Sequence, residues 1–221
     1  MEEQIINMPA VALRGLTILP GMIAHFDVSR ERSLRAIEEA MEQDQKIYLV
    51  TQKNVDREDP TQEDLYQMGI VADIKQVVRL QNDVVRILVD GISRAKLLGF
   101  TGCEKYIEAE ICYCDSNADS LPEDLKEAML LGVREAFHRY AAVIGKISKE
   151  LIRQIDQYED LEKLIDYVTN NLPVSYELKQ QVLEAEDIND RYQVIVSLLL
   201  SQVEVISIKN ELQKKVKVRV D

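Results

Sequence analysis

The chain has 221 residues and a formal net charge of −12 at pH 7. This length predicts one or two domains, and the acidic balance argues against a nucleic-acid partner, because phosphate contacts require clustered lysine and arginine. No apolar run approaches the ~20 residues that span a bilayer, and the acidic start MEEQIINMPAVAL is unlike a secretory signal. A cytoplasmic protein with no membrane partner is expected.

A strand, a turn, a second strand and a helix are predicted from Pro9 to Met41. Short apolar runs lead to the turn dipeptide Pro20-Gly21. Apolar and polar residues alternate over 22–27, which predicts a strand, and Ser29 is placed to cap the helix that follows. The apolar face of that helix has spacings of three and four residues, and it consists of Leu34, Ile37 and Met41.

Further short strands follow, joined by turns. Strands are predicted at 47–50, from Gly69, on the return through 85–89, and at 106–113, with a polar loop over 52–64. The strand from Gly69 should present one apolar face, made of Ile70, Ala72, Ile74, Val78 and Leu80. The residues Gln81-Asn82-Asp83 predict a tight turn, and Gly91 a bulge or bend. Together these elements predict a small antiparallel barrel or curled sheet.

After Ser116 the apolar residues recur at the spacing of a helix instead of that of a strand. Ser120 to Glu123 fits a capping box, Gly145 is placed to end that helix, and Ser148 to cap the next. Two more helices are expected, one around 161–168 and one after Ser175.

The final helix is predicted from Ile188 with no stop signal before Asp221. At ~1.5 Å per residue it would reach roughly 50 Å, so its end, with the basic tail 209–219, is expected to project. Its apolar stripe is predicted to be Ile195, Leu199, Gln202, Ile206, Leu212 and Val216.

The predicted fold is α+β, in three parts. A β-rich domain is expected over 1–116, a helical bundle over 117–187, and a long helix over 188–221. The boundary is placed at the polar segment DSNADS, where the period changes.

Three segments, which together cover nearly the whole chain, resemble the amino-terminal region of bacterial Lon proteases, which are ATP-dependent AAA+ serine proteases. The first is ALRGLTILPGMIAHFDVSRERSLRAIEEAM. The second, KIYLVTQKNVDREDPTQEDLYQMGIVADIKQVVRLQNDVVRILVDGISRAKLL, is similar to the family's strand ending in Q-K, its acidic proline loop and its D-L-Y-x-x-G motif. Ala12 and His25 stand where the family usually or often has proline, and Ser29 where it usually has glycine. The third segment, NNLPVSYELKQQVLEAEDINDRYQVIVSLLLSQVEVISIKNELQKKV, resembles the Lon segment that leads into a long coiled-coil helix. The resemblance implies a PUA-like pseudobarrel for the β-rich part and a coiled-coil helix after the bundle.

No catalytic, cofactor or metal site is predicted in the chain itself. It contains no P-loop and no G-x-S-x-G elbow; the segment Gly145-Lys146-Ile147-Ser148 is interpreted as a helix end followed by a cap. The cysteines, Cys103, Cys112 and Cys114, are too few for a zinc site and are expected to be reduced and structural. His25 and His138 have no Cys or Ser motif beside them, which favours structural or surface roles and disfavours a small metalloenzyme.

Two features are candidates for binding. Glu31, Arg32 and Arg35 lie opposite the apolar stripe of the first helix, either as an ordinary solvated face or as the polar rim of a substrate groove. Met22 and Ile23 follow the Pro20-Gly21 turn, either as core residues or as part of an exposed apolar patch.

The resemblance implies the substrate-capture region of a Lon-like protease that degrades misfolded, damaged and regulatory proteins. It further implies unfolded or tagged proteins as partners, a homohexameric parent, and ATP, magnesium and a Ser/Lys dyad in later domains. The chain ends within a helical pattern, which suggests a piece of that longer protein. The alternative is a free-standing adaptor or ligand-binding module on the same β domain.

Overall fold

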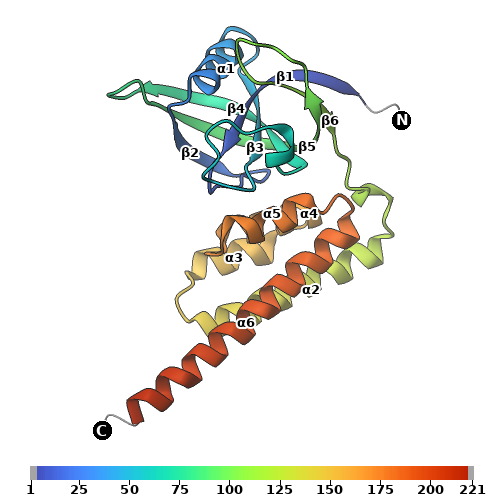
Figure 1. Cartoon of the computed structure of the whole chain (residues 1–221). Coiled ribbons are helices and arrows are strands. Elements are labelled where there is room, and N and C mark those ends of the chain that lie inside the picture. The colour runs from blue at the N-terminus through green and yellow to red at the C-terminus, as the bar shows by residue number, and fades with distance from the viewer. Residues whose placement is uncertain (1–3, 219–221) are drawn as a thin grey trace. The chain divides into compact units, whose positions relative to one another are not determined.

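The structure is a computed structural model that describes residues 4–218, with side chains to residue 215. It divides into two compact units. The first, called the β unit here, runs to Asp115 and also includes Pro173–Glu184. The second, the helical unit, comprises Ser116–Leu172 and the chain from Ala185 onward. The predicted α+β class is confirmed, with a six-stranded sheet and a long last helix in the described residues (Figure 1).

The β unit is built on one sheet of six strands in the order β2-β5-β4-β3-β1-β6. An additional pairing between β5 and β6 closes the sheet on itself, which leaves β2 at the margin. Helix α1 (Glu31–Glu42) packs against β1 and β3. The strands are β1 (Ile5–Leu13), β2 (Ile23–Val28), β3 (Lys46–Thr51), β4 (Met68–Arg79), β5 (Val85–Phe100) and β6 (Glu108–Tyr113).

The core of the β unit has two layers, because β1 and β3 are buried on both faces. These strands pair in parallel, with Ala10 opposite Tyr48 and Val11 opposite Leu49. Successive residues of a strand point to opposite faces, so Val11 and Leu49 join the cluster beneath α1. Ala10 and Tyr48 join the cluster on the other face. A continuous apolar run, as in KIYLVT, is what a strand buried on both faces requires.

The apolar face predicted for β4 is correct only to Ile74. The pairing of β4 with β5 shifts register between Ile74 and Gln76, and an extra residue at a bulge moves the following side chains to the opposite face. Val77 therefore packs against the core, whereas Val78 and Leu80 are each 40% exposed. The alternation of apolar and polar residues in a sequence does not show where such a register shift occurs.

The tight turn predicted at Gln81-Asn82-Asp83 forms, and so does the bulge predicted at Gly91, where the pairing with β4 shifts register between Val71 and Ala72. Asn82 and Asp83 both have positive φ, 59° and 57°, as a tight hairpin turn requires. At Gly91 a Cβ atom would lie 2.5 Å from the carbonyl oxygen of Leu19. Only glycine permits this close approach of two backbone segments.

Two predicted helix caps are wrong. Helix α1 begins one residue later than expected, with Arg30 rather than Ser29 at its N-cap and no side-chain cap. Helix α2 (Glu123–Ile144) has Pro122 at its N-cap. Ser120 instead closes a short 3-10 turn, where its hydroxyl donates to the Asn117 carbonyl at 2.7 Å. Leu121 and Pro122 are extended, so the helix starts beyond the reach of Ser120.

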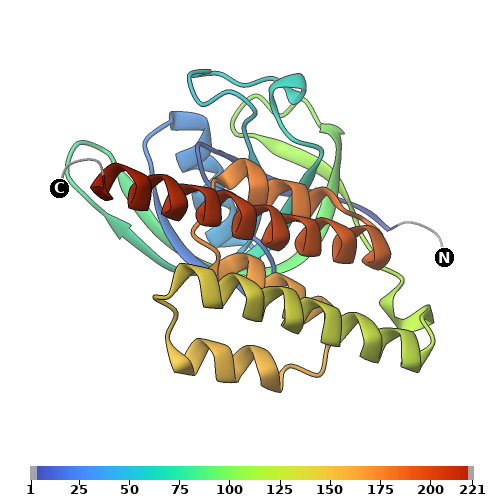
Figure 2. The same ribbon diagram turned by 90° about the horizontal axis from the view of Figure 1, so that it is seen from below.

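The helical unit contains α2 with α3 (Lys149–Gln157), α4 (Leu161–Asn171) and α6 (Ile188–Val218), and α6 runs alongside α2 (Figure 2). Gly145 ends α2 with φ of 66°, and the Ser148 hydroxyl caps α3 by accepting the Leu151 N–H at 3.1 Å, both as predicted. Arg191 is 1% exposed and fixes the start of α6 through the Ala185 and Glu186 carbonyls and the Glu162 carboxylate.

The apolar stripe of α6 is buried only in its first half. Ile195 and Leu199 are fully buried, whereas no described side chain after Leu199 on this helix is. Leu212 is 58% exposed; Val216 and the end of the predicted basic tail lie outside the described side chains. Among the described residues α6 alone is long and apolar enough to cross a membrane by length and composition, which by itself is weak evidence for a membrane span.

Helix α5 (Tyr176–Glu184) belongs to the β unit, although the sequence placed it in the bundle over 117–187. Gln180 is 1% exposed, and its Nε2 donates to the Met68 carbonyl at 2.9 Å. The Thr17 hydroxyl donates to Gln180 Oε1 at 3.0 Å, and Glu184 accepts the Met68 N–H at 3.1 Å. These buried bonds need partners distant in the sequence, so local periodicity could not place α5.

Candidate functional site

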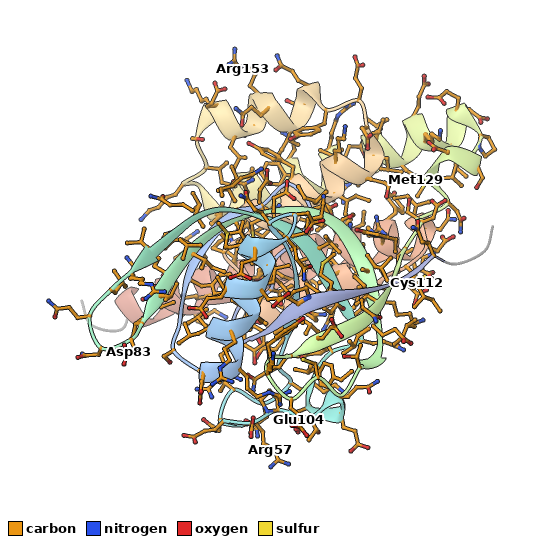
Figure 3. All side chains as sticks on the ribbon, turned by 90° about the horizontal axis from the view of Figure 1, so that it is seen from above. Arg57, Asp83, Glu104, Cys112, Met129 and Arg153 are labelled. Atoms are coloured by element: carbon orange, nitrogen blue, oxygen red, sulfur yellow. The ribbon has the colours of Figure 1, made fainter. Side chains whose placement is uncertain are left out.

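The β unit carries a groove between α1 and the β4–β5 hairpin. The groove has a volume of about 470 Å³, within the range of ligand sites in proteins. Figure 3 labels Asp83 at the tip of the hairpin, away from the barrel. The groove is lined from two sides. One side is α1 with the segment that leads into it (Ser29, Glu31, Leu34, Ile37, Glu38), and the other is the hairpin (Val77, Arg79, Leu80, Asp83, Val84, Val85).

The floor of the groove is apolar. Leu34 of α1, Val77 of β4 and Val85 of β5 are half-buried and pack against the core cluster. Leu80 also lines the groove and is 40% exposed. The bulge after Ile74 creates this arrangement, because it turns Val77 toward the helix.

The rim of the groove is charged and mostly acidic. Arg79 Nη2 lies 3.3 Å from Glu38 Oε1, so this pair links the hairpin to α1. Glu31 pairs with Arg35 one turn along α1, and Asp83 adds a carboxylate at the turn. All four paired side chains are more than half exposed, so they steer an approaching charge more than they stabilise the fold.

The structure separates the predicted binding residues into two places. Glu31 and Arg35 lie together on the exposed side of α1, with Glu31 at the groove. Arg32 points elsewhere and donates to the carbonyls of Cys103 and Tyr106 at 3.3 and 3.4 Å. Met22 is half-buried and packs against the core, whereas Ile23 is 69% exposed.

Ile23 lies far from the groove. It begins β2, and the groove adjoins the end of that strand at Ser29. At about 3.4 Å per residue, Ile23 and Val28 are about 17 Å apart along the strand. Met22 and Ile23 therefore cannot share one small patch with Glu31.

The sequence did not identify the hairpin side of the groove. Val77, Leu80 and Val84 flank a polar turn, and paired apolar residues on both sides of a turn were the available signal. Because of the bulge after Ile74, the alternating pattern placed these side chains on the wrong face of the strand. The wall that they form could therefore not be predicted.

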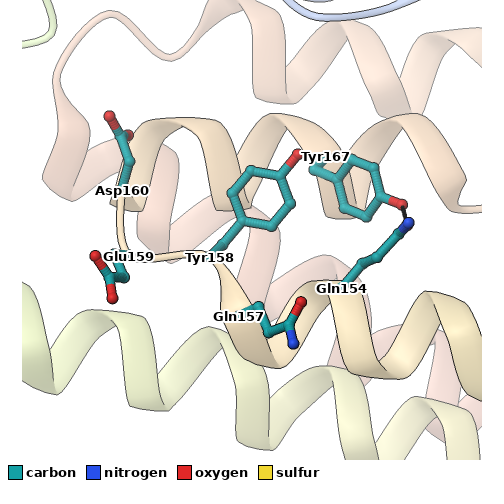
Figure 4. Close-up of a pocket in the computed structure, with 6 residues that line it drawn as sticks. All are labelled: Gln154, Gln157, Tyr158, Glu159, Asp160 and Tyr167. Carbon is teal, nitrogen blue, oxygen red and sulfur yellow. Dashed lines mark hydrogen bonds between the residues drawn. The ribbon is translucent and has the colours of Figure 1, made fainter.

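The helical unit has its own hollow of about 500 Å³ between α3 and α4. The rings of Tyr158 and Tyr167 lie 4.9 Å apart, and the Tyr167 hydroxyl bonds to Gln154 (Figure 4). Asp160 is engaged as the cap of α4, accepting the Lys163 N–H at 3.0 Å, and Figure 4 shows it away from the two rings. Among the polar side chains that line this hollow, Gln154, Asp160 and Tyr167 therefore have local partners.

The titratable groups of the β unit have structural roles. Arg86 donates twice to Asp27, at 2.7 and 2.9 Å, and holds the pKa of that carboxyl below its usual value. Hydrogen bonds from the Thr61 backbone and hydroxyl lower the pKa of Asp64, and burial raises the pKa of Tyr48. No group of three or more metal-ligating side chains occurs among the residues that the structure describes. In the helical unit, His138 is exposed and lies 2.8 Å from Asp156.

The comparisons with known proteins decide the family. The model of the ATP-dependent protease La (LON) substrate-binding domain matches residues 7–201. The chain belongs to the LON substrate-binding domain family. Over 221 residues it is 38% identical to a Lon protease of Lachnoclostridium phytofermentans, covering 100% of this chain and 27% of the relative. A Lon protease of Clostridioides difficile is 34% identical over 214 residues, covering 96% and 27%.

The solved structures agree with this LON assignment at the level of the fold. The N-terminal domain of a Mycobacterium avium complex Lon protease has a TM-score of 0.71 at 18% identity, covering 88% of this chain and 98% of that one. A Lon N-terminal domain protein from Xanthomonas campestris has a TM-score of 0.59 at 13% identity, covering 87% and 98%. The LON chain spans about a quarter of the length of the curated relatives it matches.

Proposed function

We propose that this LON domain captures unfolded or tagged polypeptide for an ATP-dependent Lon protease, and that the α1–hairpin groove is a contact site. The observation that carries the proposal is an apolar floor with a charged rim, on the unit built from the family's first strands and helix. Apolar burial is non-directional, so a groove of this kind accepts many sequences.

The chain itself catalyses nothing in this proposal. Hydrolysis of ATP, with magnesium, and peptide cleavage by a Ser/Lys dyad belong to the rest of a parent that resembles the full-length relatives. That parent is proposed to act in the cytoplasm as a homohexamer. The groove does not favour the alternative, a free-standing adaptor, because a groove of this kind would suit an adaptor and a protease domain equally.

Affinity for one domain should be modest. At ~25 cal/mol per Å², burial of ~200 Å² of apolar surface stabilises a complex by about 5 kcal/mol. The loss of translational and rotational freedom is of similar size. A single domain should therefore bind at micromolar affinity or weaker, and an oligomeric parent would gain from several domains that bind one chain.

The first prediction tests the groove with Leu80→Asp. The probe is α-lactalbumin that has been reduced and alkylated with iodoacetamide, compared with its native form. The wild-type chain should bind the unfolded form only, and Leu80→Asp should weaken that binding at least fivefold, because a carboxylate in the wall opposes apolar contact. Fluorescence anisotropy gives both affinities.

A matched control is Leu125→Asp, which makes the same change at a 42% exposed leucine in the helical unit. Its affinity for the unfolded probe should equal that of the wild type. Equal weakening by both variants, or equal binding of native and unfolded α-lactalbumin, would rule out capture at the groove. Raising the salt to 0.5 M should preserve most of the binding, since the rim charges only steer the encounter.

A further inference from the structure

The outer edge of β2 is an open pairing site for another strand. β2 pairs with β5 along its whole length, from Ile23 opposite Asp90 to Val28 opposite Val85. Among the described residues no strand pairs with its other side, and Figure 1 shows β2 at the margin of the sheet.

The register shows which backbone groups face that edge. The Gly91 N–H donates to the Met22 carbonyl at 2.9 Å, and in an antiparallel pair the residues that exchange bonds recur every second position. The even-numbered residues of β2 therefore bond to β5. Ile23, His25 and Asp27 direct their N–H and C=O groups away from β5, toward the open edge.

The edge lacks the devices that usually block pairing. Natural edge strands are protected by lysine, proline, a bulge or a covering segment. The sequence of β2, IAHFDV, has neither lysine nor proline, and its register with β5 has no shift. The carboxylate of Asp27 is neutralised by Arg86. The hollow of about 180 Å³ beside Phe26, Asp27 and Val28 is also lined by residues 11–14 and Leu16, at and after the end of β1, and by Ser29, Arg30 and Ser33.

We propose that an extended segment of unfolded polypeptide adds to β2 as a further strand of the sheet. This inference rests on the proposed capture function and specifies how a substrate is recognised. In a folded protein the backbone groups already bond to one another, whereas an unfolded segment offers them free. Strand addition thus selects for the unfolded state and not for a sequence.

The location of the edge fits a capture surface. Ile23, 69% exposed, gives an apolar contact beside the first open backbone group. At the other end, Ser29 follows β2 directly and lines the α1–hairpin groove. A chain added to β2 can continue into that groove, where its side chains meet the apolar floor.

The second prediction tests the role of the substrate backbone. The probe is an eight-residue peptide of alternating leucine and serine, blocked at both ends, titrated into the ¹⁵N-labelled full chain by NMR. The amides of Ile23, His25 and Asp27 should shift on binding. The same peptide with its four central amides N-methylated should bind at least tenfold more weakly, because N-methylation removes the donors.

The outcomes separate the two proposals. Equal or tighter binding of the methylated peptide would overturn strand addition while leaving apolar capture intact, since methyl groups add apolar surface. No binding of either peptide or of unfolded α-lactalbumin would overturn both. Concentration-dependent dimerisation of the free chain in sedimentation, blocked by changes in β2, would assign the edge to a second copy instead.

Two variants address the protein side. His25→Pro removes an N–H that faces the open edge and keeps the β2–β5 bonds, a position where proline is tolerated. His25→Thr keeps the N–H and removes the imidazole. The proline variant should bind the unmethylated peptide about tenfold more weakly, and the threonine variant should match the wild type. Equal affinity of the proline variant and the wild type would contradict the proposal.

Discussion

At the scale of single residues, close backbone contacts matter more than charges in this fold. The ion pairs of α1 are exposed and each contributes a few tenths of a kcal/mol. Gly91 instead allows β5 to pass against the Leu19 carbonyl. Its N–H also donates to the Met22 carbonyl, which fixes the start of β2. One glycine thus positions the strand whose outer edge is open.

The third prediction is that Gly91→Ala destabilises the β unit. The added Cβ would lie 2.5 Å from the Leu19 oxygen and 2.9 Å from Ile70 Cδ1. Relief requires a backbone shift, so the free energy of unfolding should fall by about 1–3 kcal/mol. Urea denaturation followed by circular dichroism measures the change.

Gly99→Ala, in the same strand, is the control. Its new Cβ would meet nothing nearer than Gln62 Oε1 at 3.7 Å. The change in stability should stay within about 0.5 kcal/mol, typical of uncrowded sites. Equal losses for the two variants would show that the close approach at Gly91 is not what limits substitution.

At the scale of elements, sequence patterns specified most strands and helices but not their faces or partners. Strand β3 and the turn at Asn82-Asp83 follow from local residues, because an apolar run and a polar turn are local signals. The bulge in β4 and the attachment of α5 depend on distant partners. The groove combines both cases: Glu31 on its helix side is among the residues that the sequence singled out as candidates, and no residue on its hairpin side is.

Helix α6 shows the same limit along its length. Its start and its apolar stripe were predicted, yet Ile195 is buried and Leu212 is 58% exposed on the same stripe. Periodicity identifies the face of a helix that can be buried. It does not state how far along the helix a partner continues.

The fourth prediction concerns hydrogen exchange along α6. Amides of 190–199 should exchange slowly, because their turns pack in the helical unit. Amides of 203–215 should exchange at least tenfold faster in a monomer, since no described side chain there is buried. Mass spectrometry of peptides from each half provides the comparison. Uniformly slow exchange in a sample shown to be monomeric would contradict this assignment.

At the scale of the whole molecule, the two units are interleaved in the sequence. The chain passes from the β unit to the helical unit after Asp115, returns at Pro173, and leaves again after Glu184. A linear division at 116 and 187 therefore misplaces α5. Because the units are interleaved, a single cut in the chain does not separate one unit from the other.

The fifth prediction is that one cut does not release the β unit. Asn117, Asp119 and Ser120 are exposed, and limited proteolysis should cut there or in the 52–64 loop first. After a cut at 117–120, α5 still bonds to the strands through Gln180 and Glu184. The two products should co-elute in native gel filtration and separate only in denaturant. Separation under native conditions would show that α5 is not a stable part of the β unit.

The return of α5 also sets an order of events during synthesis on the ribosome. Chains emerge from the N-terminus at about 5–20 residues per second, and domains generally fold as units. All six strands have emerged by Tyr113, yet Gln180 and Glu184, which bond to both backbone groups of Met68, come about 70 residues later. For several seconds the nascent β unit therefore lacks the buried bonds that α5 supplies. Helices α2, α3 and α4 of the helical unit are synthesised before the β unit can be completed.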